Sequence, residues 1–155
     1  MTAIEAPGAT AANALWMLNS LMLERATGAD TGGTLTVHEQ WVTAAGNPPL
    51  HVHDRQDELF LVLDGEIEVL LGARTIAVPS GSAAFGPRGI PHTYAIRDGI
   101  AHLFVVSTPS GLEDFFREIG DPAAALALPE PSTPDVPTVI AAAARHGVTI
   151  LPPSP

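Results

Sequence analysis

Residues 46–65 read GNPPLHVHDRQDELFLVLDG, and this stretch decides the fold class. His51 and His53 stand two positions apart in an extended segment, so both imidazoles leave the same face of a strand. Glu58 opens the next apolar run and offers a carboxylate to those imidazoles. Imidazole and carboxylate donors together suit divalent transition metals. The stretch therefore predicts part of a metal site built on a sheet.

A second stretch, GSAAFGPRGIPHTYAI at residues 81–96, supplies a third imidazole from His92. It follows far enough along the chain for intervening hairpins to bring His92 back beside Glu58. Three imidazoles and one carboxylate leave one or two positions of a metal open, which binding of substrate or dioxygen requires. Asp57 is a rival for the carboxylate, because both faces of the run 57–63 are apolar and alternation does not choose between them.

The rest of the chain is typical of an all-β protein. Fifteen Pro and fourteen Gly among 155 residues are too many for a helical bundle. Between residues 15 and 109, short apolar runs alternate with Gly- and Pro-containing turns and predict seven or eight strands in a barrel or sandwich. The first strand is expected over 15–22 and the second over 34–42.

We expect three parts along the chain. Residues 1–14 form a flexible N-terminal arm, residues 15–109 form the β-barrel, and residues 110–155 form a helical and Pro-rich extension packed on the barrel. Residues 121–137 contain five Pro and read as a linker that wraps around the barrel.

Two short helices are expected in the extension. Ser110 and Glu113 have the spacing of a capping box, and Gly120 ends the helix that they begin. Asp135 caps a second, Ala-rich helix. Residues 148–151 have the composition of an added edge strand.

Composition excludes several functional classes. Seven basic residues against seventeen acidic ones give a net charge of −10, which argues against nucleic-acid or anionic-membrane partners. The absence of Cys excludes disulfides, thiolate metal sites and a cysteine nucleophile. Because no signal-peptide pattern and no long apolar run is found, the chain is expected in the cytoplasm.

The two histidine-containing stretches resemble the motifs of the cupin family. The first family motif is Gly, about five residues, His-x-His, three or four residues, Glu, six residues and Gly. It is matched by Gly46, His51, His53, Glu58 and Gly65, with four residues instead of five before the first His. The second motif, Gly-x5-Pro-x-Gly-x2-His-x3-Asn, is matched by Gly81, Pro87, Gly89 and His92. Its Asn position holds Ile96, a departure at a residue that is not a ligand in the family.

This resemblance implies a double-stranded β-helix, or jelly-roll, barrel. It also implies one divalent transition metal per chain (Fe, Mn, Ni, Co or Zn), held by His51, His53, Glu58 and His92. The family spacing favours Glu58 over Asp57 as the carboxylate ligand.

The flanking segments 30–33, 48–50 and 108–116 resemble single-domain bacterial cupins similar to quercetin 2,3-dioxygenase. By that resemblance the protein is an oxygenase of a flavonol-like or other enolisable phenolic substrate. Glu58 would accept the substrate proton, with its pKa tuned towards the working pH, and dioxygen would open the ring. The resemblance also implies a homodimer, bridged by residues 121–137 or by the N-terminal arm.

Two other functions stay open at this point. One is a redox-neutral metal cupin, either an isomerase or a polyketide cyclase. The other is a non-catalytic cupin that binds a small molecule.

Three aromatic residues are predicted to contact a substrate. They are Tyr94, Phe60 and Phe104, and each has the alternative role of a barrel-filling aromatic. Tyr94 follows His92 by two positions and should share its inward face. His38 and His102 are expected to be structural histidines with satisfied hydrogen bonds.

Overall fold

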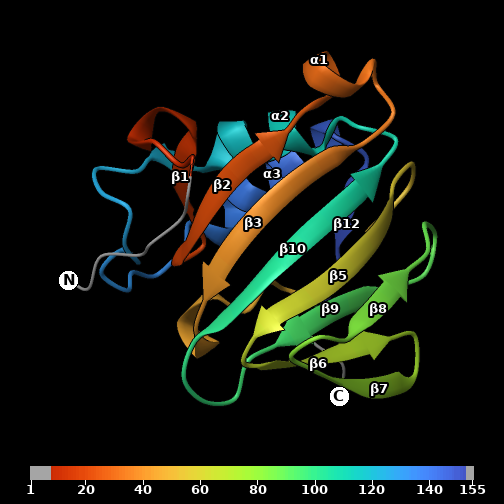
Figure 1. Ribbon diagram of the computed structural model, residues 1–155. Coiled ribbons are helices and arrows are strands. Elements are labelled where there is room, and N and C mark those ends of the chain that lie inside the picture. Colours follow the sequence, from red (N-terminus) through yellow and green to blue (C-terminus); the bar gives the residue numbers. More distant parts are fainter. Residues whose placement is uncertain (1–7, 153–155) are drawn as a thin grey trace.

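The computed structural model describes residues 8–152, which form two antiparallel sheets and a few short helices. In spatial order, the seven-stranded sheet contains β11 (Asp121–Pro122), β1 (Ala14–Met17), β2 (Ser20–Ala26), β3 (Thr36–Val42), β10 (Ala101–Thr108), β5 (Asp57–Asp64) and β8 (Ala83–Gly86). The five-stranded sheet contains β12 (Val148–Ile150), β4 (His51–His53), β9 (His92–Ala95), β6 (Glu66–Leu71) and β7 (Arg74–Pro79). The larger sheet lies in front in Figure 1, with the smaller one behind and below it. The all-β prediction is confirmed.

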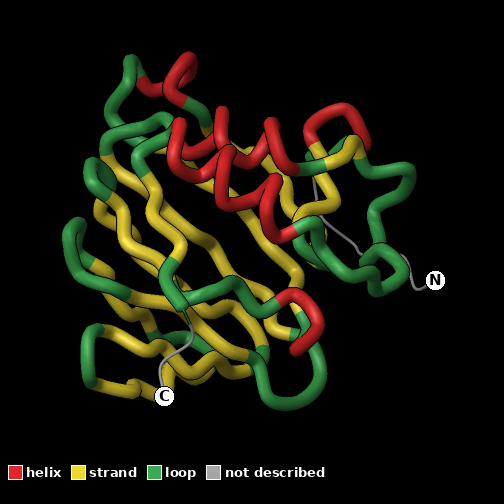
Figure 2. The backbone as a smooth tube through the Cα atoms, turned by 180° about the vertical axis from the view of Figure 1, so that it is seen from behind, coloured by secondary structure: helices red, strands yellow, loops and turns green. Residues whose placement is uncertain are grey.

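The helices are α1 (Gly28–Thr31), α2 (Leu112–Ile119) and α3 (Val136–Arg145), with 3-10 turns at Ala11–Asn13 and Ala44–Gly46. Seen from behind in Figure 2, α2 and α3 lie across the part of the larger sheet that the smaller sheet leaves uncovered. The four apolar residues of α2, spaced at helical intervals, pack into this region together with Met17 and Met22 of β1 and β2. Among the described residues, no helix is long and apolar enough to cross a membrane.

The main core lies between the two sheets. Alternate residues of β10 and β5 point inward, and Leu103, Val105, Phe60 and Val62 are at most 3% exposed. At the turn between β5 and β6, Gly65 has φ +77°, and a Cβ there would lie 2.7 Å from the Ile100 carbonyl oxygen. The glycine of the first motif is therefore required by a close backbone approach.

The single strand expected over residues 15–22 is wrong. Leu18 and Asn19 have φ of +47° and +63° and form a two-residue turn, so the run is split into the hairpin of β1 and β2. This split contributes to the presence of ten strands, β1 to β10, between residues 14 and 108 instead of seven or eight. The second expected strand corresponds to β3.

Apolar residues of α2 and α3 in the extension pack with Met17 and Met22 of the larger sheet, and α2 begins at a different residue from the one predicted. Gly111, not Ser110, is the N-cap of α2, and Glu113 accepts a hydrogen bond from the Gly111 backbone N–H at 2.7 Å. The cap at Asp135 is confirmed, because its side chain accepts from the Thr138 backbone N–H. The expected edge strand is β12, which pairs with β4.

Residues 121–137 wrap on their own chain. β11 pairs with β1, and the Trp16 indole N–H donates to the Ala127 carbonyl oxygen at 2.8 Å. The Ser132 backbone N–H donates to Asn19 in the β1–β2 turn. Residues 121–137 are one of the two segments expected to bridge subunits, but the contacts described here lie within one chain. Of the N-terminal arm, residues 1–7 lie outside the described residues.

Candidate metal centre

Three strands bring four predicted ligands together. His51 and His53 come from β4, Glu58 from β5 and His92 from β9, and one donor atom from each lies within 4.8 Å of the others. His51 is paired directly opposite His92 across the smaller sheet, while Glu58 reaches in from the larger one. Glu58 is 4% exposed and His92 is fully buried.

The carboxylate lies at the centre of the three imidazoles. Glu58 Oε2 is 2.9 Å from His92 Nε2, 3.0 Å from His53 Nε2 and 3.9 Å from His51 Nε2. His53 Nε2 is near Glu58 Oε2 but is not aligned for a hydrogen bond. Neither ring nitrogen of His53 has a hydrogen-bond partner among the described residues. A buried imidazole left in this state is suited to give its lone pair to a metal.

Backbone carbonyls orient two of the imidazoles. His51 Nδ1 is 2.7 Å from the Pro49 carbonyl oxygen, and His92 Nδ1 is 2.9 Å from the Ile90 carbonyl oxygen. A carbonyl oxygen accepts a hydrogen bond, so each Nδ1 carries a proton, and Nε2, which faces Glu58, is the ring nitrogen that remains available as a metal ligand. This is the arrangement that a metal-ligating histidine needs, and the residues present therefore fit a divalent metal.

Gly86 leaves room for the His92 ring, and Asp57 is bound to a residue outside the histidine group. Gly86 lies opposite Glu58, and a Cβ there would already be 3.4 Å from three atoms of the His92 ring. Asp57, the rival carboxylate, instead binds Arg88, whose Nε and guanidinium nitrogen lie 3.0 and 2.9 Å from its oxygens. Hydrogen bonds from Arg88 lower the pKa of Asp57 to about 2.

Burial and charge act on the pKa of Glu58 in opposite directions. Burial is the largest single effect and raises it, but the three surrounding imidazoles together outweigh burial and hold the pKa well below its usual range. The expectation that this pKa moves towards the working pH is wrong for this structure. Burial lowers the pKa of His92, but its hydrogen bond to Glu58 and the charge of that carboxylate outweigh burial and raise this pKa.

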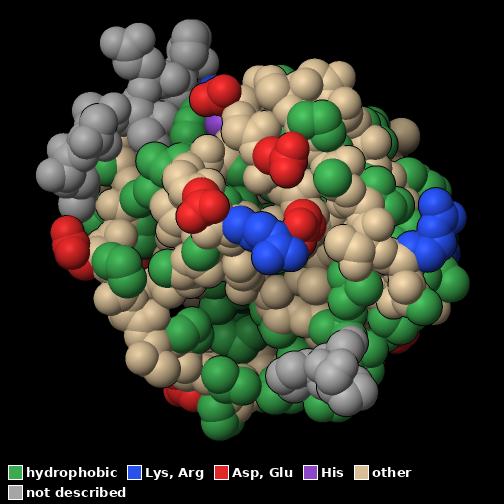
Figure 3. All heavy atoms as spheres, turned by 90° about the horizontal axis from the view of Figure 1, so that it is seen from below, with side chains coloured by type: hydrophobic (Ala, Val, Ile, Leu, Met, Phe, Trp, Pro, Cys, Tyr) green, Lys and Arg blue, Asp and Glu red, His purple; other side chains and the backbone are tan. Residues whose placement is uncertain are grey.

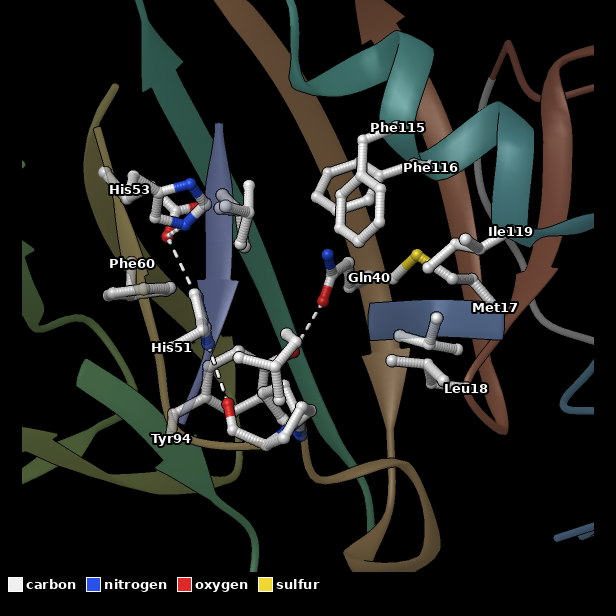
Figure 4. A pocket seen from close by; sticks show the side chains of 17 residues that line it. Met17, Leu18, Gln40, His51, His53, Phe60, Tyr94, Phe115, Phe116 and Ile119 are labelled. Atoms are coloured by element: carbon white, nitrogen blue, oxygen red, sulfur yellow. Dashed lines mark hydrogen bonds and ion pairs between the residues drawn. The ribbon is translucent and has the colours of Figure 1, made fainter. Parts of the chain in front are cut away.

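A pocket leads from the metal centre to the helices. It is partly open to solvent. Its far walls are apolar and come from Met17, Leu18, Phe115, Phe116, Ile119 and Val139. Figure 4 shows the labelled members of this set on the side of the pocket opposite the histidines: Met17, Leu18, Phe115, Phe116 and Ile119. Hydrophobic side chains also line a hollow on the face seen in Figure 3.

Two of the three predicted substrate contacts line this pocket. Phe60 packs against the rings of His92 and Tyr94, with centroids 5.9 and 5.5 Å apart. The Tyr94 hydroxyl donates to Gln40 Oε1 at 2.7 Å, and burial together with the charge of Glu58 raises the pKa of Tyr94. Phe104 does not line the pocket, and its prediction is wrong. It alternates with the inward-facing Leu103 and so lies on the outer face of the larger sheet.

The two remaining strand histidines differ from each other. His102 is structural as expected: its ring stacks on Trp41 and its Nε2 lies 2.6 Å from Glu39. His38 is fully buried, but neither ring nitrogen has a hydrogen-bond partner among residues 8–152, so the expectation of a satisfied histidine is wrong. Burial is the main cause that lowers the pKa of His38 to about 4.

Sequence reasoning missed Gln40. Its signal was weak, because a single Gln in a strand of alternating residues carries no motif. Only the register of β3 against β10, which places Gln40 opposite the inward-facing Leu103, puts it in the pocket wall.

The fold and the histidine–glutamate group together define the class of this protein. The family model for the cupin domain matches residues 33–107, so the chain contains a cupin domain, and its two sheets form the cupin barrel. A curated relative, quercetin 2,3-dioxygenase of Bacillus subtilis (strain 168), is 34% identical over 74 residues. The match covers 48% of this chain and 22% of the relative, about a fifth of its length.

Solved structures share the fold. KdgF from Halomonas sp. superposes with a TM-score of 0.55 at 17% identity, covering 62% of this chain and 85% of that one. The Cnp3 cupin domain of Schizosaccharomyces pombe also has a TM-score of 0.55, at 20% identity over 74% of this chain and 79% of the other. Both likenesses concern the fold alone.

Proposed function

We propose that this chain is a metal-dependent oxygenase that uses O2 on a flavonol-like or other enolisable phenolic molecule. The observation that carries the proposal is a buried group of three His and one Glu at the end of an apolar pocket. The likeness to a quercetin 2,3-dioxygenase over the cupin domain supports the same reaction class.

His51, His53, Glu58 and His92 are the residues that would hold one divalent metal per chain, whether Fe, Mn, Ni, Co or Zn. When bound, such a metal supplies positive charge that stabilises a substrate oxyanion, and a redox-active metal also supplies electron transfer. The carbonyl contacts at Nδ1 hold His51 and His92 with Nε2 turned toward the centre, where each would bind the metal.

Glu58 is the proposed proton acceptor. It is ionised and buried, and Oε2 faces the three imidazoles at the end of the pocket where a phenolic hydroxyl would enter. An ionised carboxylate at this position takes the hydroxyl proton as the substrate becomes an oxyanion. A proton on Oε2 would remove the negative charge of Glu58 and weaken its attraction to the three imidazoles. Glu58 therefore holds the proton only while the substrate oxyanion is present.

The pocket walls position and shield the substrate. Phe60 lies beside the metal centre, and Phe115 and Phe116 face it across the cavity (Figure 4). Flat aromatic molecules bury large area against such rings, and the same walls exclude water from a reactive oxyanion. Tyr94 is proposed to complete the wall rather than to contact the metal.

A homodimer remains our prediction for the assembly. Because residues 121–137 pack against β1 of their own chain, we do not assign the bridge to them. Sedimentation velocity measures the state directly: a species of twice the 16.1 kDa chain mass supports the dimer, and a monomer contradicts it.

Oxygen consumption tests the proposed reaction. The metal-free protein is loaded separately with Fe(II), Mn, Co, Ni or Zn, and dissolved oxygen is followed after quercetin is added. Metal-dependent uptake with stoichiometric loss of quercetin is the expected result. No uptake with any fully bound metal contradicts the oxygenase and moves the weight to a redox-neutral isomerase or cyclase, or to a binding protein.

A further inference from the structure

Gln40 is a buried polar side chain that the metal centre does not explain. It lines the pocket from β3 and is only 3% exposed. Its Oε1 accepts the hydrogen bond from the Tyr94 hydroxyl, but Nε2 has no partner among the described residues. Nε2 is not among the fully buried atoms that lack a partner, so it borders the open space of the pocket. The Gln40 nitrogen is therefore a hydrogen-bond donor that a ligand in the pocket could pair with.

Tyr94 determines which end of the amide faces the cavity. The Tyr94 hydroxyl donates to Gln40 Oε1 at 2.7 Å, which leaves Nε2 as the other end of the amide. Tyr94 is itself held in β9 opposite Val69 and against the Phe60 ring. In Figure 4 the Gln40 nitrogen consequently points away from Tyr94, toward Phe115 and Phe116.

The rest of the pocket offers this donor no competitor. Its polar lining consists of the metal-binding group other than His92, together with Gln40 and Tyr94, and every other lining side chain is apolar. Gln40 lies opposite Leu103 in β10, and Glu58 lies opposite Ser107 in the same strand. Gln40 and Glu58 are thus offset by four positions along the strands and by two strands across the sheet. Their Cα atoms are on the order of 15 Å apart. The two side chains therefore extend from different parts of the pocket wall.

We propose that the Gln40 amide N–H recognises an acceptor oxygen, carbonyl or hydroxyl, at the end of the ligand remote from the metal centre. Tyr94 acts as the positioning residue that keeps the nitrogen turned into the cavity. The ligand class is an apolar, largely flat body with oxygen functions at two opposite ends. The assignment of the metal-side oxygen rests on the proposed function, whereas the Gln40 contact is tested without it.

Two probes that differ by one oxygen atom test the contact. 1-Indanone carries a carbonyl on a bicyclic apolar body, and indane is the same body without it. Their dissociation constants are measured by NMR titration of zinc-loaded protein, for the unaltered chain and for Gln40→Met. Gln56→Met is the matched control, because Gln56 is equally buried, at 4% exposed, but does not line the pocket.

The unaltered chain is expected to bind 1-indanone about tenfold more tightly than indane, as one buried hydrogen bond predicts. Gln40→Met is expected to bind both probes equally, and Gln56→Met to keep the preference. Equal affinities in the unaltered chain, no binding of either probe, or a preference that survives in Gln40→Met overturns the proposal. Survival in that variant would assign the carbonyl to the metal instead.

Tyr94→Phe supplies a second variant in case Gln40→Met does not fold. It keeps the amide but removes the group that orients it, so the preference is expected to fall below about threefold while indane affinity is unchanged. A full preference in Tyr94→Phe overturns the positioning role. Oxygen uptake with quercetin is a separate readout, because neither probe carries the hydroxyl-enone group of a flavonol. Failure of the oxygenase and failure of the Gln40 contact are thus distinguishable.

Discussion

The buried His38 predicts a pH dependence of stability that a single substitution removes. Its ring is fully buried, lies edge-on to Phe116 with centroids 4.9 Å apart, and has no hydrogen-bond partner among the described residues. Burial lowers the pKa of His38 to about 4, although the charges of Glu113 and Glu58 oppose that change. The folded protein therefore holds this imidazole neutral at a pH where an exposed one is charged.

The magnitude follows from the two pKa values. In the unfolded chain the imidazole titrates near 6.5 and in the folded chain near 4, a difference equivalent to about 3 kcal/mol. Between these values the unfolded state binds a proton that the folded state does not. The free energy of unfolding contributed by His38 is thus complete above pH 6.5 and is lost as the pH falls towards 4.

Urea denaturation between pH 4 and 7.5, with a chelator present, measures the effect in the unaltered chain and in His38→Leu. The variant is expected to gain about 3 kcal/mol relative to the unaltered chain on going from pH 7.5 to pH 4. Other titrating groups cancel in the difference between the two proteins. A difference that is the same at both pH values would refute the account of a neutral, unpartnered histidine.

Two further substitutions test the site and the fold. Glu58→Gln is expected to retain part of the metal and to lower quercetin turnover at least about a hundredfold, because the amide accepts no proton; oxygen uptake measures this, and full activity rules out the role of base. Gly65→Ala is expected to cost more than about 2 kcal/mol in urea denaturation, since a Cβ would meet the Ile100 carbonyl oxygen at 2.7 Å and φ is +77°. Gly81→Ala, with φ +79° but nothing within 4 Å of the added carbon, is the matched control and is expected to cost only about 1 kcal/mol. Equal losses in the two alanine variants would contradict the steric argument.

The grouping of His51, His53 and Glu58 is predictable from the sequence because these residues lie close together along the chain. Two histidines at alternate positions of one strand need no long-range information to share a face. The approach of His92 to Glu58 depended on the family motif, because no local pattern shows which hairpins close the barrel. Asp57 could not be excluded from the sequence, since only the position of Arg88 shows where that carboxylate points.

The errors arise where strand faces and turns are set by partners distant in sequence. Neither residue of the turn between β1 and β2, Leu18 or Asn19, is Gly or Pro. The sequence of residues 15–22 therefore does not predict this turn. Phe104 was assigned to the pocket, but β10 is apolar on both faces and its alternation is visible only in the pairing with β3 and β5. The place of Gln40 in the pocket is not predictable from the sequence for the same reason. The sheet face on which its side chain lies depends on the register of the strands.

Metal content per chain shows directly whether the three histidines and Glu58 bind a metal ion. Each protein is incubated with one divalent metal, passed through a desalting column and assayed by atomic emission. The account predicts about one metal ion per unaltered chain, loss of the metal in His51→Ala and His92→Ala, and full retention in the control Asp57→Asn, whose side chain faces Arg88 instead. No bound metal in the unaltered chain, or unchanged occupancy in both histidine variants, would contradict the metal centre on which the proposed chemistry depends.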